Sequence, residues 1–394
     1  MFVRLIVFLN SGYSFLGVDE NYYLGLSRDF IKGVPFKSFF LPGWPFVLSL
    51  FFRVFDGILA ARLFVIVAGS VTPALVYMLG EKIYSKKVGL VAGLLMAFYP
   101  EHIFFSHYIQ AEIILEILII LVTLLSFHNS QEFSKPRLLL MVFLLMGLGL
   151  LYKHFIVLPF IVLWSLLLYC RRSVVFLVAV GGLFILPTLV YGLYTLRMGG
   201  DPLLLINSPL KSADEWSHGK AANFTAQRKG DFLKAHIDSL RERGLSGVWQ
   251  KTKWNIFNLW TPNAHHITRL SNGHYKGFKH PWVSIYLSVA FFTFLLVVGA
   301  KGFIFGEMTL FRLYSVGNFT VLSMMCLGVF MISRYRFPFI FLLALSAAEV
   351  AVNVRRPHSD FFHQKWGRVI IFVFFIITVG FIYYRKLPRL GSWF

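Results

Sequence analysis

Charged residues and cysteines are scarce in this sequence. Only 14% of its 394 residues are charged, whereas 57% are hydrophobic, a share well above the roughly 45–50% of soluble globular proteins. This imbalance excludes an ordinary soluble domain. The two cysteines, Cys170 and Cys326, lie in or at the end of apolar runs, so they indicate no disulfide framework.

Acidic residues are fewer still, with 18 Asp and Glu against 38 Lys and Arg, which gives a net charge of +20. Such an excess can indicate nucleic-acid binding, but these basic residues lie mainly in short loops between apolar segments or in one polar stretch. Anionic membrane lipids explain that arrangement better. We therefore expect an all-α polytopic membrane protein that contacts membrane lipids and binds no nucleic acid.

Long apolar runs predict the number of membrane spans. Because a helix needs about 20 apolar residues to cross a bilayer, the sequence predicts about 11 transmembrane helices, from a short first run at 4–17 to a last one at 368–384. Lys82, Lys86 and Lys87 follow the span at 60–80 and mark its cytoplasmic end. We expect one transmembrane domain over residues 1–394, without a separate soluble C-terminal domain.

Two segments are expected to lie outside the cytoplasm between spans. In the first extracytoplasmic loop, 18–58, the apolar spacing of Tyr23, Leu26 and Phe30 predicts an amphipathic surface helix, and the run around Trp44 predicts a second interfacial helix. The long loop, 201–281, carries twelve Lys and Arg against six Asp and Glu.

This topology gathers ionisable residues on one membrane face. The stretches "VDEN", "PEH", "QAE", "YKH" and "SRYRFP" all fall on the extracytoplasmic side. An ionisable group at membrane depth costs about 2.5 kcal/mol or more, so such groups usually face a cavity and a partner. Asp19 and Glu20 could supply a general base, whereas Lys153, Arg334 and Arg336 could hold a phosphate.

Four stretches, in order along the chain, resemble one family. They are "VDENYYLGLSRDFIKG", the segment from Ala61 to Glu112 with Arg62, Gly80, Gly89 and Pro100, then "LLMGLGLLYKHFIVLPF" and "SRYRFPFIFLLALSAA". Together they resemble the GT-C glycosyltransferases. The resemblance is greatest to bacterial relatives of the dolichyl-phosphate-mannose-protein mannosyltransferases, including the aminoarabinose transferase and Rgt-like group.

The resemblance implies a GT-C fold and an inverting transfer of a sugar from a polyprenyl-phosphate donor. The acceptor would be a lipid, a glycan or a protein on the periplasmic face of a bacterial inner membrane. Asp19 matches the family's catalytic acid, and Lys153, Arg334 and Arg336 would hold the donor phosphate. Lys37 is a further phosphate candidate, although it stands five residues before Pro42, whereas the aminoarabinose group carries a Lys immediately before the proline.

Structural explanations compete with these roles. Asp19 could cap a helix, Glu20 could support Asp19, and Lys153 could extend from a hairpin tip toward the interface. Glu101 and Glu112, with His102, are candidates for contacting the acceptor or a divalent cation such as Mg²⁺ or Mn²⁺, because hard cations take carboxylate oxygens.

Two other functions are compatible with the composition. An O-antigen ligase or polymerase also uses a lipid-linked donor and a long outer loop, but its key residues would lie in that loop. A polytopic transporter should show paired repeats and broken spans at mid-depth, and the sequence shows neither. Substitution of Asp19 separates the first alternative from the glycosyltransferase hypothesis.

Overall fold

The computed structural model describes residues 1–10, 17–34, 40–55, 57–197, 232–261, 267, 281–327 and 333–353. The described residues form helices and connecting turns, and their only β-type pairing is an isolated antiparallel bridge between Phe127 and Phe133. The all-α prediction is therefore confirmed. The span expected at 368–384, Lys37 and most of the long loop lie outside the described residues.

The helices follow the predicted apolar runs. The first half of the chain contains α1 (Phe2–Asn10), α2 (Val18–Ile31), α3 (Gly43–Phe52), α4 (Ile58–Ile83), α5 (Lys86–Phe98), α6 (Pro100–Phe105), α7 (Glu112–Ser126), α8 (Pro136–Leu150), the 3₁₀ turn η1 (His154–Ile156), α9 (Val157–Tyr169) and α10 (Val174–Arg197). The second half contains α12 (Phe232–Trp260), α14 (Pro281–Phe305), α15 (Leu310–Met324), the 3₁₀ turns η3 (Met325–Leu327) and η4 (Ser333–Phe339), and α16 (Ile340–Val352).

Among the described residues, four segments are long and apolar enough to cross a membrane: 58–83, 174–197, 282–305 and 334–352. The other apolar helices are shorter, so the structure supports a membrane protein without fixing the number of spans at 11. The predicted first run is helical only over Phe2–Asn10 within the part of the chain described.

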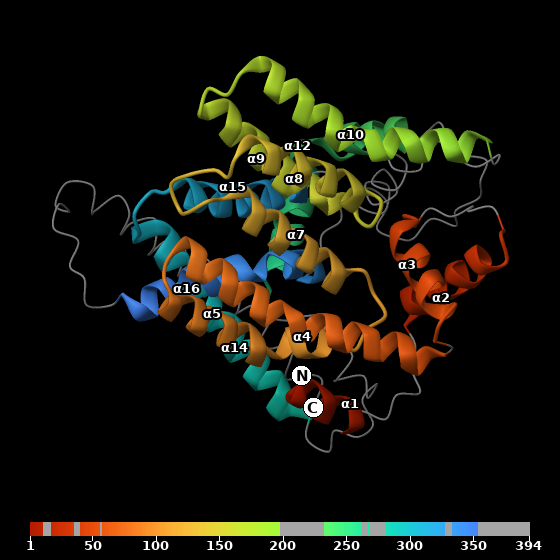
Figure 1. Cartoon of the computed structure of the whole chain (residues 1–394), viewed down its shortest axis with the longest axis horizontal. Helices are drawn as coiled ribbons and strands as arrows, with labels where there is room; N and C mark the ends of the chain where they lie inside the picture. The colour runs from red at the N-terminus through yellow and green to blue at the C-terminus, as the bar shows by residue number, and fades with distance from the viewer. Residues whose placement is uncertain are drawn as a thin grey trace.

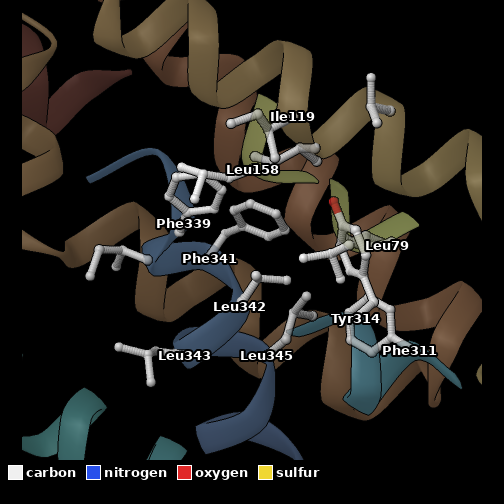
Figure 2. Packing of buried hydrophobic residues seen from close by; sticks show 14 of the residues in the cluster. Leu79, Ile119, Leu158, Phe311, Tyr314, Phe339, Phe341, Leu342, Leu343 and Leu345 are labelled. Carbon is white, nitrogen blue, oxygen red and sulfur yellow. The ribbon is translucent and has the colours of Figure 1, made fainter. Parts of the chain in front are cut away.

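The late helix α16 lies in the middle of the bundle (Figure 1). Its side chains Phe341, Leu342 and Leu345 are at most 1% exposed, and they pack among Leu79 of α4 and Ile119 of α7 (Figure 2). Burying an apolar side chain of this size contributes about 1.5–3 kcal/mol. The core thus holds the start of α16, the helix that directly follows η4.

Helices α4 and α5 are antiparallel neighbours that approach very closely. A Cβ atom added to Gly89 would stand 2.5 Å from the carbonyl oxygen of Tyr77, and one added to Gly80 would stand 2.7 Å from the Cα of Gly89. Small residues permit such close approach in membrane helix pairs. This contact fixes the position of α5, which leads directly into α6 and its acidic stretch "PEH".

The two helices predicted for the first loop are present as α2 and α3. They pack against each other at one end of the bundle, at the right of Figure 1. The indole of Trp44 is fully buried, and its Nε1–H donates to the carbonyl of Ile109 at 3.3 Å. This contact joins α3 to the turn before α7, so the helix that carries Asp19 is held against the bundle.

Candidate active site

Asp19 lies in the first turn of α2 and forms an ion pair with Arg334 of η4. Nη1 of Arg334 donates to Oδ2 of Asp19 at 2.6 Å, although 315 positions separate the two residues. The Asp19 side chain remains 28% exposed and that of Arg334 16% exposed. The structure therefore brings together the candidate base and one candidate phosphate ligand, with the carboxylate still accessible.

The cluster continues through Glu112 to Lys153. Nε of Arg334 lies 3.9 Å from Oε1 of Glu112, and Nζ of Lys153 donates to the same oxygen at 2.8 Å. Four charges of alternating sign thus meet from α2, η4, α7 and the turn between α8 and η1. We call Asp19, Arg334, Glu112 and Lys153 the charge cluster.

The cluster's environment keeps its lysine protonated. Burial alone would lower the pKa of Lys153, but the Glu112 carboxylate beside it outweighs that effect and raises the pKa above its usual value. Burial also raises the pKa of Tyr23 to about 12, although the Lys153 charge opposes it. Near neutral pH the cluster therefore offers a cationic lysine beside a neutral phenol.

Tyr23 and Tyr335 were not predicted from the sequence to be site residues. Tyr23 is 4% exposed, and the guanidinium carbon of Arg334 stands 5.6 Å from the ring centroid of Tyr335. Tyr335 directly follows Arg334 in the chain, and Tyr23 lies one helical turn after Asp19 in α2. Only the fold shows that both rings border the charge cluster.

Glu20 has a different environment from its neighbour Asp19. Its Oε2 accepts a hydrogen bond from the backbone N–H of Gly17 at 2.7 Å, and its Oε1 accepts one from the N–H of Ile109 at 3.0 Å. Glu20 is fully buried. By accepting from the N–H of Gly17, Glu20 caps the start of α2, a role that the sequence also allowed for Asp19. By accepting from the N–H of Ile109, it connects α2 to the turn before α7.

Arg336 lies two residues after Arg334 but outside the charge cluster. Its Nη1 donates to the carbonyls of Leu259 and Thr261, both at 2.6 Å, and its Nη2 lies 3.5 Å from Oε2 of Glu101. The Arg336 side chain is fully buried. The structure thus places two predicted site residues, Arg336 and Glu101, together at the end of α12 and away from Asp19.

His102, the third acceptor or metal candidate, belongs to another buried group. Nη2 of Arg4 lies 2.7 Å from its Nδ1, and Oε2 of Glu116 lies 2.9 Å from its Nε2. Neither Arg4 nor Glu116 was predicted to be functional, although an acid inside the apolar run of α7 is the signal that could have found Glu116. Ser106 completes the group by accepting from Nε of Arg4 at 3.0 Å.

The carboxylates predicted to bind a divalent cation fall into separate places. Glu112 bonds to Lys153, Glu101 receives a hydrogen bond from the hydroxyl of Tyr99, and His102 lies between Arg4 and Glu116. Within the described ranges no three His, Cys, Asp or Glu side chains come together to hold a metal ion. Glu101, Glu112 and His102 therefore do not fit a shared preformed cation site.

Comparison with known families adds to this geometry. Residues 38–191 match the model of the dolichyl-phosphate-mannose-protein mannosyltransferase family. The structure of ArnT from Cupriavidus metallidurans bound to undecaprenyl phosphate superposes with a TM-score of 0.52 over 97% of this chain, at 15% sequence identity. This chain has the GT-C fold. The resemblance found in the sequence is thus confirmed.

The chain spans only part of the length of the structures that it resembles. The chain spans 63% of that ArnT structure. It also aligns with the archaeal oligosaccharyltransferase AglB from Archaeoglobus fulgidus, in complex with an inhibitory peptide and a dolichol-phosphate, at 14% identity, a TM-score of 0.46, and coverage of 99% of this chain and 55% of that one. Comparison with curated protein sequences finds no match.

Proposed function

We propose that the protein is an inverting glycosyltransferase that transfers a sugar from a polyprenyl-phosphate donor to an acceptor on the extracytoplasmic side of the membrane. The observation that carries the proposal is the charge cluster on a GT-C fold, in which the accessible Asp19 carboxylate pairs with Arg334 and Glu112 links Arg334 to Lys153. The similar structure of ArnT holds bound undecaprenyl phosphate, which supports a lipid-phosphate donor here. A lipid-linked donor also explains why such an enzyme is embedded in a membrane.

In this proposal Asp19 is the general base. The acceptor hydroxyl or amide gives its proton to the Asp19 carboxylate while its oxygen or nitrogen attacks the anomeric carbon of the donor sugar. The bond from that carbon to the phosphate oxygen breaks on the opposite face, so the configuration inverts. A positioned base of this kind accelerates a reaction by about 10²–10⁴-fold.

Arg334 and Lys153 are the proposed ligands of the donor phosphate. The leaving phosphate gains negative charge as the glycosidic bond breaks, and cations already in place stabilise that charge. Both residues bond to carboxylates, Asp19 and Glu112, at 2.6 and 2.8 Å. A bound phosphate would take over these carboxylate contacts, which would leave Asp19 available to the acceptor. Arg336 is bonded elsewhere and has no part in this step, and Lys37 remains a prediction.

Reconstitution with defined donors tests the proposal. Purified protein in lipid vesicles is incubated with a panel of undecaprenyl-phosphate sugars and with lipid, glycan and peptide acceptors, with product detection by mass spectrometry. We expect transfer from at least one donor, with inversion shown by NMR and with release of undecaprenyl phosphate. Absence of transfer from every donor would contradict the glycosyltransferase assignment. Treatment with a chelator, followed by addition of Mg²⁺ or Mn²⁺, tests the predicted cation in the same assay.

A further inference from the structure

Arg336 joins the end of α12, which belongs to the long loop, to the membrane helices. Its Nη1 donates to two carbonyl oxygens, those of Leu259 and Thr261. These carbonyls lie at the C-terminal end of α12, where helical carbonyls have no partner within the helix. The guanidinium carbon stands 3.7 Å from the ring centroid of Phe292 in α14, and Glu101 of α6 adds a carboxylate at 3.5 Å.

The same short turn carries Arg334, which bonds to Asp19. In a 3₁₀ turn of three residues per revolution, side chains two positions apart point roughly 120° away from each other. The turn η4 therefore directs Arg334 toward the charge cluster and Arg336 toward the end of α12. Phe337 and Phe339 in the same turn are fully buried, so η4 is a rigid connection between them.

We propose that Arg336 is a positioning residue: by binding the end of α12 it sets the place of η4, and thereby the contact between Arg334 and Asp19. Helix α12 is coupled to the proposed base through this turn. A change in the position of α12 moves Arg336, and the rigid turn transmits that movement to Arg334. The role in turnover rests on the proposed function, whereas the structural coupling does not.

A double-mutant cycle on stability tests the coupling without any turnover. Melting temperatures are measured in detergent for wild type, Asp19→Asn, Arg336→Lys and the double variant. If Arg336 positions Arg334, the Asp19 ion pair is already weakened in Arg336→Lys, so the double variant loses less than the sum of the two single losses, by an amount up to the small loss that Asp19→Asn causes alone. Additive losses would refute the proposal, because sites that share no element usually add.

A matched control changes another contact of α12. Asn255 donates to the carbonyl of Cys326 in η3 at 3.1 Å, so Asn255→Ala removes a different contact of α12 while the bonds from Arg336 to Leu259 and Thr261 keep the end of α12 in place. We expect its loss to add to that of Asp19→Asn, and equal coupling in both cycles would show a general loosening of the loop and refute a specific role for Arg336. If Arg336→Lys does not fold, Glu101→Gln replaces it in the cycle, with a smaller coupling of the same sign expected.

Activity provides a second readout. With a donor that supports transfer, Arg336→Lys is expected to lower kcat about 10-fold and to move the acidic limb of its pH profile upward, because a carboxylate that loses a neighbouring cation takes up a proton more easily. Asn255→Ala should leave that limb in place, and an unmoved limb in Arg336→Lys would contradict the positioning role. Failure of wild type to transfer any sugar would count against the proposed function alone, since the stability cycle still decides the coupling.

Discussion

Replacement of Asp19 by asparagine tests the proposed chemistry most directly. Asparagine keeps the size and one oxygen of the side chain but cannot accept the acceptor's proton. Because a positioned base contributes about 10²–10⁴-fold, kcat should fall by that factor, which equals about 2.7–5.4 kcal/mol of activation free energy. The KM for the donor should change little, since Arg334 and Lys153 remain as phosphate ligands.

The same substitution should leave the fold nearly intact. Asp19 and Arg334 are 28% and 16% exposed, so their ion pair is worth about 0.2–1 kcal/mol in aqueous surroundings, and Arg334 keeps Glu112 nearby at 3.9 Å. A loss of activity with a nearly unchanged melting temperature therefore reports chemistry and not unfolding.

A matched control lies on the same helix. Asp29 is exposed near the end of α2, and Asp29→Asn removes the same charge without reaching the charge cluster, so its transfer rate should equal that of wild type. The assay is single-turnover transfer from the undecaprenyl-phosphate sugar found active in the panel. Asp19→Asn with more than half the wild-type rate would refute the reasoning, and it would favour an O-antigen ligase type of mechanism.

Three further substitutions test the site and its supports. Lys153→Met should raise the Kd for undecaprenyl phosphate about 10-fold, equal to about 1.4 kcal/mol, whereas Lys153→Arg should lose less in the same titration. Glu20→Ala should cost about 1–3 kcal/mol, because two buried N–H groups lose their acceptor, and its melting temperature should fall well below that of Glu20→Gln. Burial lowers the pKa of His107 to about 4, so the unfolded chain, whose His pKa is about 6.5, takes up a proton first as the pH falls. His107 is 1% exposed. Its contribution to the free energy of unfolding should be fully present above pH 6.5 and should fall by up to about 3 kcal/mol by pH 4. The melting temperature of His107→Gln should fall less over that range than that of wild type, and an equal fall would contradict the assignment.

Part of the candidate site could be predicted from the sequence. The alternation of spans and loops predicts acids and bases from distant segments on one membrane face, and the structure joins Asp19, Arg334, Glu112 and Lys153. Ionisable residues are costly in a membrane unless they find partners, so their occurrence at the ends of apolar runs is informative. The same reasoning could not tell which partner each residue finds.

Adjacent residues show why that choice needs coordinates. Asp19 and Glu20 follow each other in α2, where successive side chains point about 100° apart. As a result one carboxylate meets Arg334, and the other closes the start of the helix and holds the backbone of Ile109. The sequence suggested a catalytic pair, whereas the fold separates the two into a candidate base and its support.

By itself the sequence determined that this chain is helical, belongs in a membrane and resembles the GT-C glycosyltransferases, because apolar run length and composition set what a segment can bury. Only the tertiary structure decided which bonding partner each charged residue has. Arg334 and Arg336 look equivalent in "SRYRFP". In η4, however, Arg334 bonds to Asp19, whereas Arg336 bonds to carbonyls at the end of α12. The physical reason is that side-chain direction depends on the local turn and on what packs beside it, and neither is encoded in the spacing of charges along the chain.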